Sequence, residues 1–141
     1  MEDKPRTLLR LSDTQLDLAD PADDIRHFKV ADSADDEIGH VKDLFIDDIE
    51  KRVRFLEVVS GGFLGIGETE FLIPVDVITG IKNKTVRVNR TRDHVAASPL
   101  YDPKLTDERS RDEYYRNVYG YWGVSPFWVA GYAYPSFPAY P

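Results

Sequence analysis

Three histidines are the side chains in this sequence best suited to holding a metal ion: His27, His40 and His94. A zinc site needs several ligands to converge, usually histidines together with a carboxylate or a thiolate. The chain has no cysteine, and the histidines do not follow a His-x-x-x-His spacing. His27 and His40 can meet across adjacent strands, so a metal or small-ligand site is an alternative prediction. The main prediction is that the histidines lie at the surface, with no metal ligand and no cofactor.

Two other patterns match ligand-binding loops only in part. In a calcium loop starting at Asp32, Glu37 stands where glycine is required and Asp43 where glutamate is required. The glycine-rich stretch 61–67 leads into an expected strand, whereas a phosphate-binding loop opens a helix. No serine sits in a nucleophile elbow, and no Ser/His/Asp set can be assembled. These observations predict that the chain is not an enzyme.

The glycine-rich stretch carries apolar side chains at the tip of an expected hairpin. They are Phe63, Leu64 and Ile66. Exposed apolar patches usually mark contacts with other molecules, so these three residues are candidate interaction residues. The alternative is that they fold back over one end of the domain.

Aromatic residues gather at the C-terminal end of the chain. Eleven of the 17 aromatics lie in residues 113–141, a stretch in which only Glu113 and Arg116 are charged. Residues 111–119 can form a short helix with several aromatics on one side. The candidate interaction residues here are Tyr115, Tyr119, Trp122 and Trp128.

Three interpretations of this aromatic and proline-rich tail are open. It can dock on its own domain or on a neighbouring subunit, it can be a disordered low-complexity segment, or it can bind a partner or a membrane surface. Stacking on nucleic acid also needs arginine and lysine, which the tail has only at Arg116. We favour docking, because eleven bare aromatics would promote aggregation.

The charge balance also restricts the class of partner. The formal net charge is −7 and the isoelectric point is about 4.9. Direct binding to nucleic acid usually needs a basic face, so it is not expected. No run approaches the roughly 18 apolar residues of a transmembrane helix, and the N-terminal residues lack the apolar core of a signal peptide. We therefore expect a soluble cytoplasmic protein without a transmembrane segment.

The elements that must position these residues are strands. Apolar and polar residues alternate along most of the middle of the chain, with turn signals between the runs. Because no long helix separates the runs, parallel crossovers are not expected, and a mainly β, antiparallel meander closing into a small barrel is predicted. A single helical turn is expected at 90–97. The expected strands are 25–31, 39–47, 53–60, 70–75, 77–81 and 85–89.

The chain divides into three parts on composition. Residues 25–103 form the β domain, and 104–141 form a charged linker followed by the aromatic tail. Residues 1–24 form an N-terminal extension, in which leucines such as Leu8 and Leu11 can share one helical face. We interpret this extension as a docking segment.

Four residues have fold-making roles in these predictions. Gly39 enters a strand and is expected to need a positive φ. Asp47 can accept backbone N–H groups of the following turn, Gly62 allows the chain to reverse or bulge, and Pro74 should mark a strand end or an edge.

Taken in order, these segments resemble the PRC-barrel domain, named for the cytoplasmic domain of the reaction-centre H subunit. The resemblance covers residues 25–103. The segments that carry it are Val30–Asp32, Glu37–Asp47, Arg52–Val59, Ser60–Gly62, Phe71–Val75, Val86–Val88 and Ala97–Pro103. The preamble and the aromatic tail are similar to those of free-standing bacterial proteins described as reaction-centre H-subunit-like.

The resemblance implies a non-enzymatic protein-interaction or assembly module, whose partner is another protein or a second copy. A barrel of this size has a modest core, which oligomerisation would enlarge, so a homodimer is expected. One alternative, implied by a ribosome-maturation factor in the same family, is a ribosome- or RNA-processing-associated role. The other is a small-ligand or metal binder at the barrel mouth.

Overall fold

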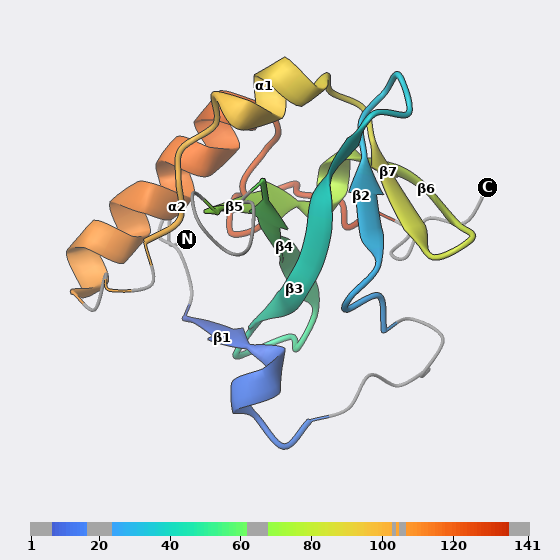
Figure 1. Cartoon of the computed structure of the whole chain (residues 1–141). Coiled ribbons are helices and arrows are strands. Elements are labelled where there is room, and N and C mark those ends of the chain that lie inside the picture. Colours follow the sequence, from blue (N-terminus) through green and yellow to red (C-terminus); the bar gives the residue numbers. More distant parts are fainter. Residues whose placement is uncertain (1–6, 17–23, 62–67, 103, 105–106, 136–141) are drawn as a thin grey trace.

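The computed structural model describes residues 7–16, 24–61, 68–102, 104 and 107–135, which form a mainly β structure, as predicted. Figure 1 shows the strands wrapped into one curved sheet, with a long helix along one side. The strands are β1 (Leu8–Arg10), β2 (Lys29–Ala31), β3 (Glu37–Asp47), β4 (Val53–Ser60), β5 (Thr69–Pro74), β6 (Ile78–Lys82) and β7 (Thr85–Val88). The helices are η1 (Leu11–Asp13), η3 (Val75–Val77), α1 (Arg92–Ala96) and α2 (Glu108–Trp122).

The sheet is mixed, whereas an antiparallel one was predicted. Its strand order is β5-β4-β3-β2-β7-β6, and β1 adds to β3. All pairs are antiparallel except β2 with β7, where Lys29 pairs with Thr85 in parallel. Parallel pairing needs a long connection, and here strands β3 to β6 supply it in place of a helix.

The two ends of the sheet are joined by the chain rather than by a hydrogen-bonded ladder. Strands β5 and β6 are at opposite ends of the strand order, yet only η3 separates them in sequence. Pro74 ends β5 and precedes η3, as expected of a residue that cannot donate to a ladder. The outer edge of β5 is partly covered, because Tyr101 N donates to Glu70 O at 2.8 Å.

The central strands are buried on both faces. Every residue of β4 from Val53 to Val59 is buried, and β3 is buried from Asp43 to Asp47. Strict alternation is lost in β3 because a bulge interrupts the pairing with β4 between Val41 and Asp43 and because α2 covers one face of the sheet. Each large aliphatic side chain that is fully buried contributes about 1.5–3 kcal/mol.

Residues Leu8–Arg10 of the N-terminal extension pair with the sheet as a strand, so Leu8 and Leu11 do not share the predicted helical face. Strand β1 pairs with the end of β3, placing Arg10 opposite Phe45. This site is open because β2 pairs only with the start of β3, at residues 37–40. Leu11 is buried in the core beyond it, with 2% of its surface exposed.

The helices begin and end at residues suited to those positions. The Asp107 side chain accepts the Ser110 N–H at 3.0 Å at the start of α2, and Gly123 ends that helix at a φ of 71°. Helix α2 is therefore longer than the predicted segment 111–119. Helix α1 matches the turn expected at 90–97, and Thr91 caps it.

Candidate interaction site

The aromatic face of α2 packs on strand β4. Tyr119 and Trp122 are each 1% exposed, and Tyr115 is 6% exposed. The ring of Phe55, in β4, lies 5.0 Å from the Tyr119 ring and 5.9 Å from the Tyr115 ring, centroid to centroid. Such aromatic pairs contribute about 0.5–1.5 kcal/mol beyond the area they bury. The outer face of the sheet is thus an apolar surface shaped to receive an aromatic helix.

The chain after α2 extends this contact. Trp128 is 6% exposed and packs edge-on against Tyr119, with ring centroids 5.4 Å apart. Phe127 lies over the guanidinium of Arg54, whose Cζ is 4.5 Å from the ring centroid. The ring centroid of Tyr134 lies 5.3 Å from the same Cζ atom. The tail therefore closes over a buried arginine of the sheet.

The structure places the four predicted aromatic residues together on one surface, in contact with their own chain. Tyr115, Tyr119 and Trp122 come from α2, and Trp128 comes from the segment after it. The predicted residues of the hairpin tip, Phe63, Leu64 and Ile66, lie outside the described residues, as does Gly62. An interaction role for all of these residues stays a prediction.

Arg54 and Asp47 form a buried ion pair beneath the tail. Arg54 Nε donates to Asp47 Oδ2 at 2.8 Å, and the two side chains are 2% and 0% exposed. Asp47 also accepts the backbone N–H groups of Ile49 and Glu50, as expected for the turn after β3. Burial raises the pKa of Asp47, but the Glu50 N–H and Arg54 outweigh it, so the pKa lies below its usual range.

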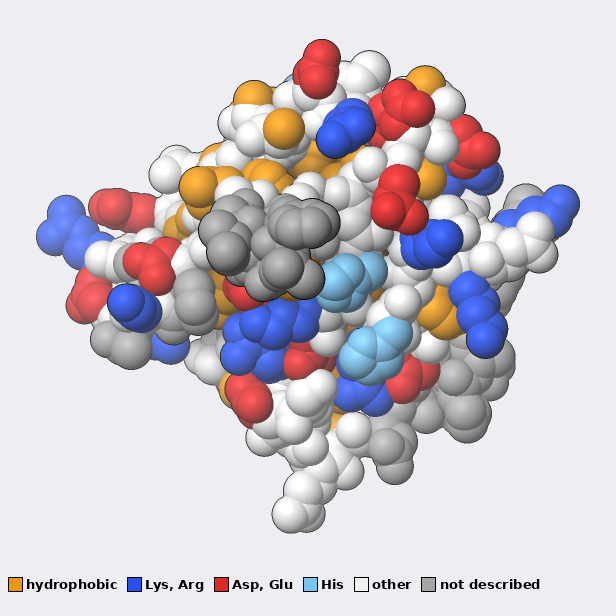
Figure 2. All heavy atoms as spheres, viewed as in Figure 1, with side chains coloured by type: hydrophobic (Ala, Val, Ile, Leu, Met, Phe, Trp, Pro, Cys, Tyr) orange, Lys and Arg blue, Asp and Glu red, His pale blue; other side chains and the backbone are white. Residues whose placement is uncertain are grey.

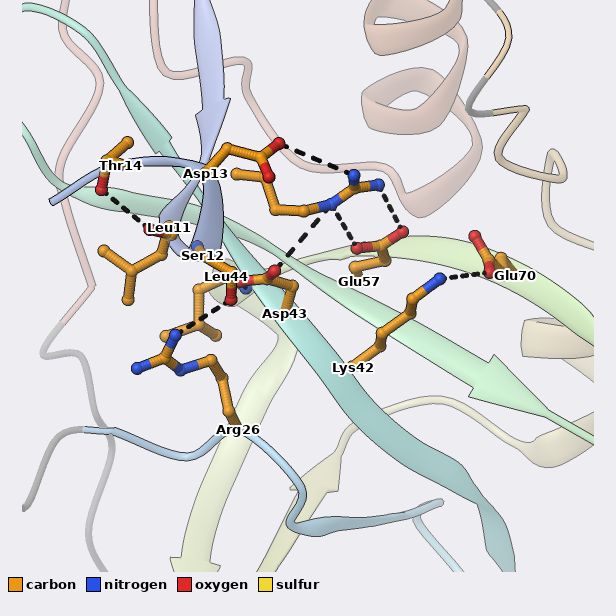
Figure 3. Close-up of polar contacts among 11 residues, drawn as sticks. Leu11, Ser12, Asp13, Thr14, Arg26, Lys42, Asp43, Leu44, Glu57 and Glu70 are labelled. Atoms are coloured by element: carbon orange, nitrogen blue, oxygen red, sulfur yellow. Dashed lines mark hydrogen bonds and ion pairs between the residues drawn. The ribbon is translucent and has the colours of Figure 1, made fainter. Parts of the chain in front are cut away.

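A second buried carboxylate holds the N-terminal strand. Arg10, in β1, donates to both oxygens of Glu57, in β4, at 3.0 and 2.9 Å. Glu57 is fully buried, and burial raises its pKa despite Arg10. Figure 3 shows Asp43 and the Lys42–Glu70 pair beside it. Because the bidentate geometry needs both strands in place, this pair fixes the extension against the sheet.

Sequence patterns did not single out Arg10, Arg54 and Glu57, although all three are central to these contacts. A usable signal was present in β4, where Arg54 and Glu57 interrupt an otherwise apolar strand. A charge inside a buried strand needs a partner, so each could have been predicted to pair. The partner's identity depends on contacts between distant residues, since Arg10 and Glu57 are 47 positions apart.

Gly39 has a fold-making role for a reason other than the one predicted. Its φ is not in the left-handed range. A Cβ atom at this position would lie 2.0 Å from Val59 O, on the neighbouring strand. Glycine is therefore required here because β3 and β4 approach closely.

Two of the three histidines lie together. His27 and His40 line one recess, whereas the His94 ring packs on Tyr121 with centroids 4.6 Å apart. Within the described residues no group of three or more His, Cys, Asp or Glu side chains could hold a metal ion. In the same part of the chain no helix is long and apolar enough to cross a membrane.

Comparison with known proteins agrees with this architecture. The family model of the PRC-barrel domain matches residues 19–95, more than half of the chain. No curated protein matches the sequence. The match spans β2 to β7 and includes both carboxylates of the buried ion pairs, Asp47 and Glu57. The chain therefore belongs to the PRC-barrel domain family.

Proposed function

We propose that this protein is a non-enzymatic assembly module of the cytoplasm, and that its partner is a second copy of itself. In this proposal residues 25–103 are the barrel, 1–24 a docked extension, and 104–141 an arm that exchanges between copies. The observation that carries the proposal is the burial of the aromatic face of α2 on the outer face of β4. An amphipathic helix lying on an apolar surface is a common mode of protein recognition.

The same surface fits α2 from either chain. The contacts of Phe55 with Tyr115 and Tyr119 would be identical in an exchanged dimer, so exchange loses none of them. Two polar atoms of the docked helix are not hydrogen-bonded: Tyr119 Oη and Trp122 Nε1 are buried without a hydrogen-bond partner among the described residues. Each such group costs about 1–3 kcal/mol in the docked state, which weakens docking of the helix.

Light scattering of the full chain over a range of concentrations tests this proposal. We expect a monomer–dimer equilibrium, and exchange of subunits between two differently tagged preparations. Because the docking contacts are the same in the monomer and in the exchanged dimer, Trp122→Ala, which removes a buried anchor, should speed the exchange of tagged subunits, whereas Asn117→Ala, on the exposed side of α2, should not. A monodisperse monomer at every concentration, with no exchange between tags, would show the proposal to be wrong.

A further inference from the structure

A recess of about 700 Å³ opens where β2, β3 and α1 meet, and none of the described residues that line it belongs to α2. Basic groups from three segments line it: His27 precedes β2, Lys29 is in β2, His40 is in β3 and Arg92 begins α1. Figure 2 shows two neighbouring histidine side chains on this face, with both lysine or arginine and aspartate or glutamate side chains around them. The volume is within the range of small-molecule sites.

The charge of the recess is opposite to that of the whole protein. The chain carries a formal charge of −7, yet Glu37 is the one carboxylate among the described residues that line the recess. Lys29 Nζ lies 3.7 Å from Glu37 Oε1, so one positive charge is balanced there. Arg92, His27 and His40 line the same space. A local basic surface on an acidic protein attracts anions.

The fold holds these groups in fixed relative positions. Lys29 and His40 are paired residues of β2 and β3, so their side chains are cross-strand neighbours. Asp32 Oδ2 accepts the Arg92 N–H at 2.8 Å, which fixes the start of α1 beside the β2–β3 turn. Gly39 and Gly61 line the recess without side chains, so a ligand can approach the backbone.

His27 stands in a backbone conformation that favours glycine. Its φ is 75°, and its N–H donates to Val41 O at 2.7 Å. A side chain in this region costs free energy, and such costs concentrate at functional sites. The turn before β2 thus places His27 at the recess.

We propose that this recess binds the phosphate group of a small organic molecule. Ammonium, guanidinium and imidazole N–H groups donate to several oxygens of one phosphate, and arginine suits that geometry best. The volume exceeds what a single phosphate fills and leaves space for the organic remainder. This site is separate from the α2 surface and does not depend on exchange between copies.

The test is an NMR titration of the full chain with pyrophosphate and with inorganic phosphate, at constant ionic strength with chloride as the control anion. We expect saturable shifts of the amide signals of Lys29, His40 and Arg92, with α2 unaffected. Arg92→Ala should weaken binding at least about tenfold. Arg109→Ala removes the same charge from the exposed side of α2 and should leave binding unchanged.

His27→Gly separates a binding role from a folding role. Glycine relieves the positive φ, so the melting temperature should not fall, while the affinity for pyrophosphate should fall several-fold. If shifts never saturate, or if Arg92→Ala and Arg109→Ala weaken binding equally, the interaction is general electrostatic attraction and the proposal is wrong. Unchanged affinity in His27→Gly would remove His27 from the site.

Discussion

The buried pair of Arg54 and Asp47 shows how one charged residue can organise two segments. Arg54 meets a carboxylate on one side and the aromatic rings of the tail on the other. Its charge is thereby compensated where water is excluded, as a buried charge requires. The ion pair with Asp47 and the packing of the tail on Arg54 therefore depend on each other. Without Asp47 the guanidinium would be buried without this carboxylate, and without the tail it would be exposed to water.

Arg54→Ala should therefore be strongly destabilising. It leaves the Asp47 carboxylate buried without the Arg54 guanidinium, and breaking a buried ion pair in this way typically lowers the free energy of unfolding by about 3–5 kcal/mol. Arg52→Ala is the matched control, because Arg52 is about half exposed and pairs with Glu50 at 3.9 Å; its effect should stay below about 1 kcal/mol. Urea unfolding followed by circular dichroism measures both. Equal losses would contradict a special role for the buried pair.

The raised pKa of Glu57 leads us to expect that the free energy of unfolding depends on pH in an unusual direction. Its pKa in the folded protein is raised above the ordinary value of 4.5, so the folded state binds the proton more tightly than the unfolded state. The stabilisation from this group is then fully present below about pH 4.5 and is lost as pH rises through the raised pKa.

The free energy of unfolding of the native chain, minus that of Glu57→Gln, isolates this contribution. The difference should increase as pH falls from 7.5 towards 4.5 and stay constant below that value. The pair with Arg10 opposes this trend, since it favours the charged carboxylate. A difference that decreases with falling pH would mean that Arg10 outweighs burial.

At the scale of elements, the close approach of β3 and β4 depends on one missing side chain. Gly39→Ala places a Cβ atom against the Val59 carbonyl of β4 and should cost about 1–3 kcal/mol. Gly120→Ala is the control within α2, where a Cβ meets nothing within 4 Å. Removing glycine from a helix interior should stabilise by about 0.5–1 kcal/mol. Thermal melts of the two variants should shift in opposite directions.

The sequence predicted strand positions better than strand partners. Alternation located β4 and β5 because each has a face that must be apolar. Alternation carries no information about which strands pair, so the parallel contact of β2 with β7 was missed. Strand β1 was missed because three residues are too few for a period, and its pairing depends on an edge that β3 leaves open.

The sequence predicted which aromatic residues form the candidate interaction site, but not the contacts that position them. A concentration of tyrosine and tryptophan indicated a docking arm, and the buried α2 face agrees with that expectation. The ion pairs beneath it were not predicted, because each joins residues of different elements. For the recess, the sequence predicted only that His27 and His40 can meet across adjacent strands. The position of Arg92 beside them was not predicted, because it depends on where α1 packs.

At the scale of the whole molecule, barrel and tail should unfold as one unit. Both tryptophans, Trp122 and Trp128, are in the tail, whereas the strands dominate the rest of the fold. Tryptophan fluorescence thus reports docking of the tail, and far-ultraviolet circular dichroism reports the sheet together with α2. Because the two share one core, their urea transitions should coincide. A fluorescence change at lower urea would show that the tail detaches first.

The parallel contact of β2 with β7 has a consequence for how the chain folds. Lys29 and Thr85 are 56 positions apart, whereas the β3–β4 and β6–β7 hairpins join near neighbours. Closing a long loop costs more entropy than closing a hairpin, and non-local strand pairs slow folding. We expect the hairpins to form early and the β2–β7 contact to form last. Until that step the β7 edge is unpaired, so refolding at high protein concentration should favour aggregation at this strand.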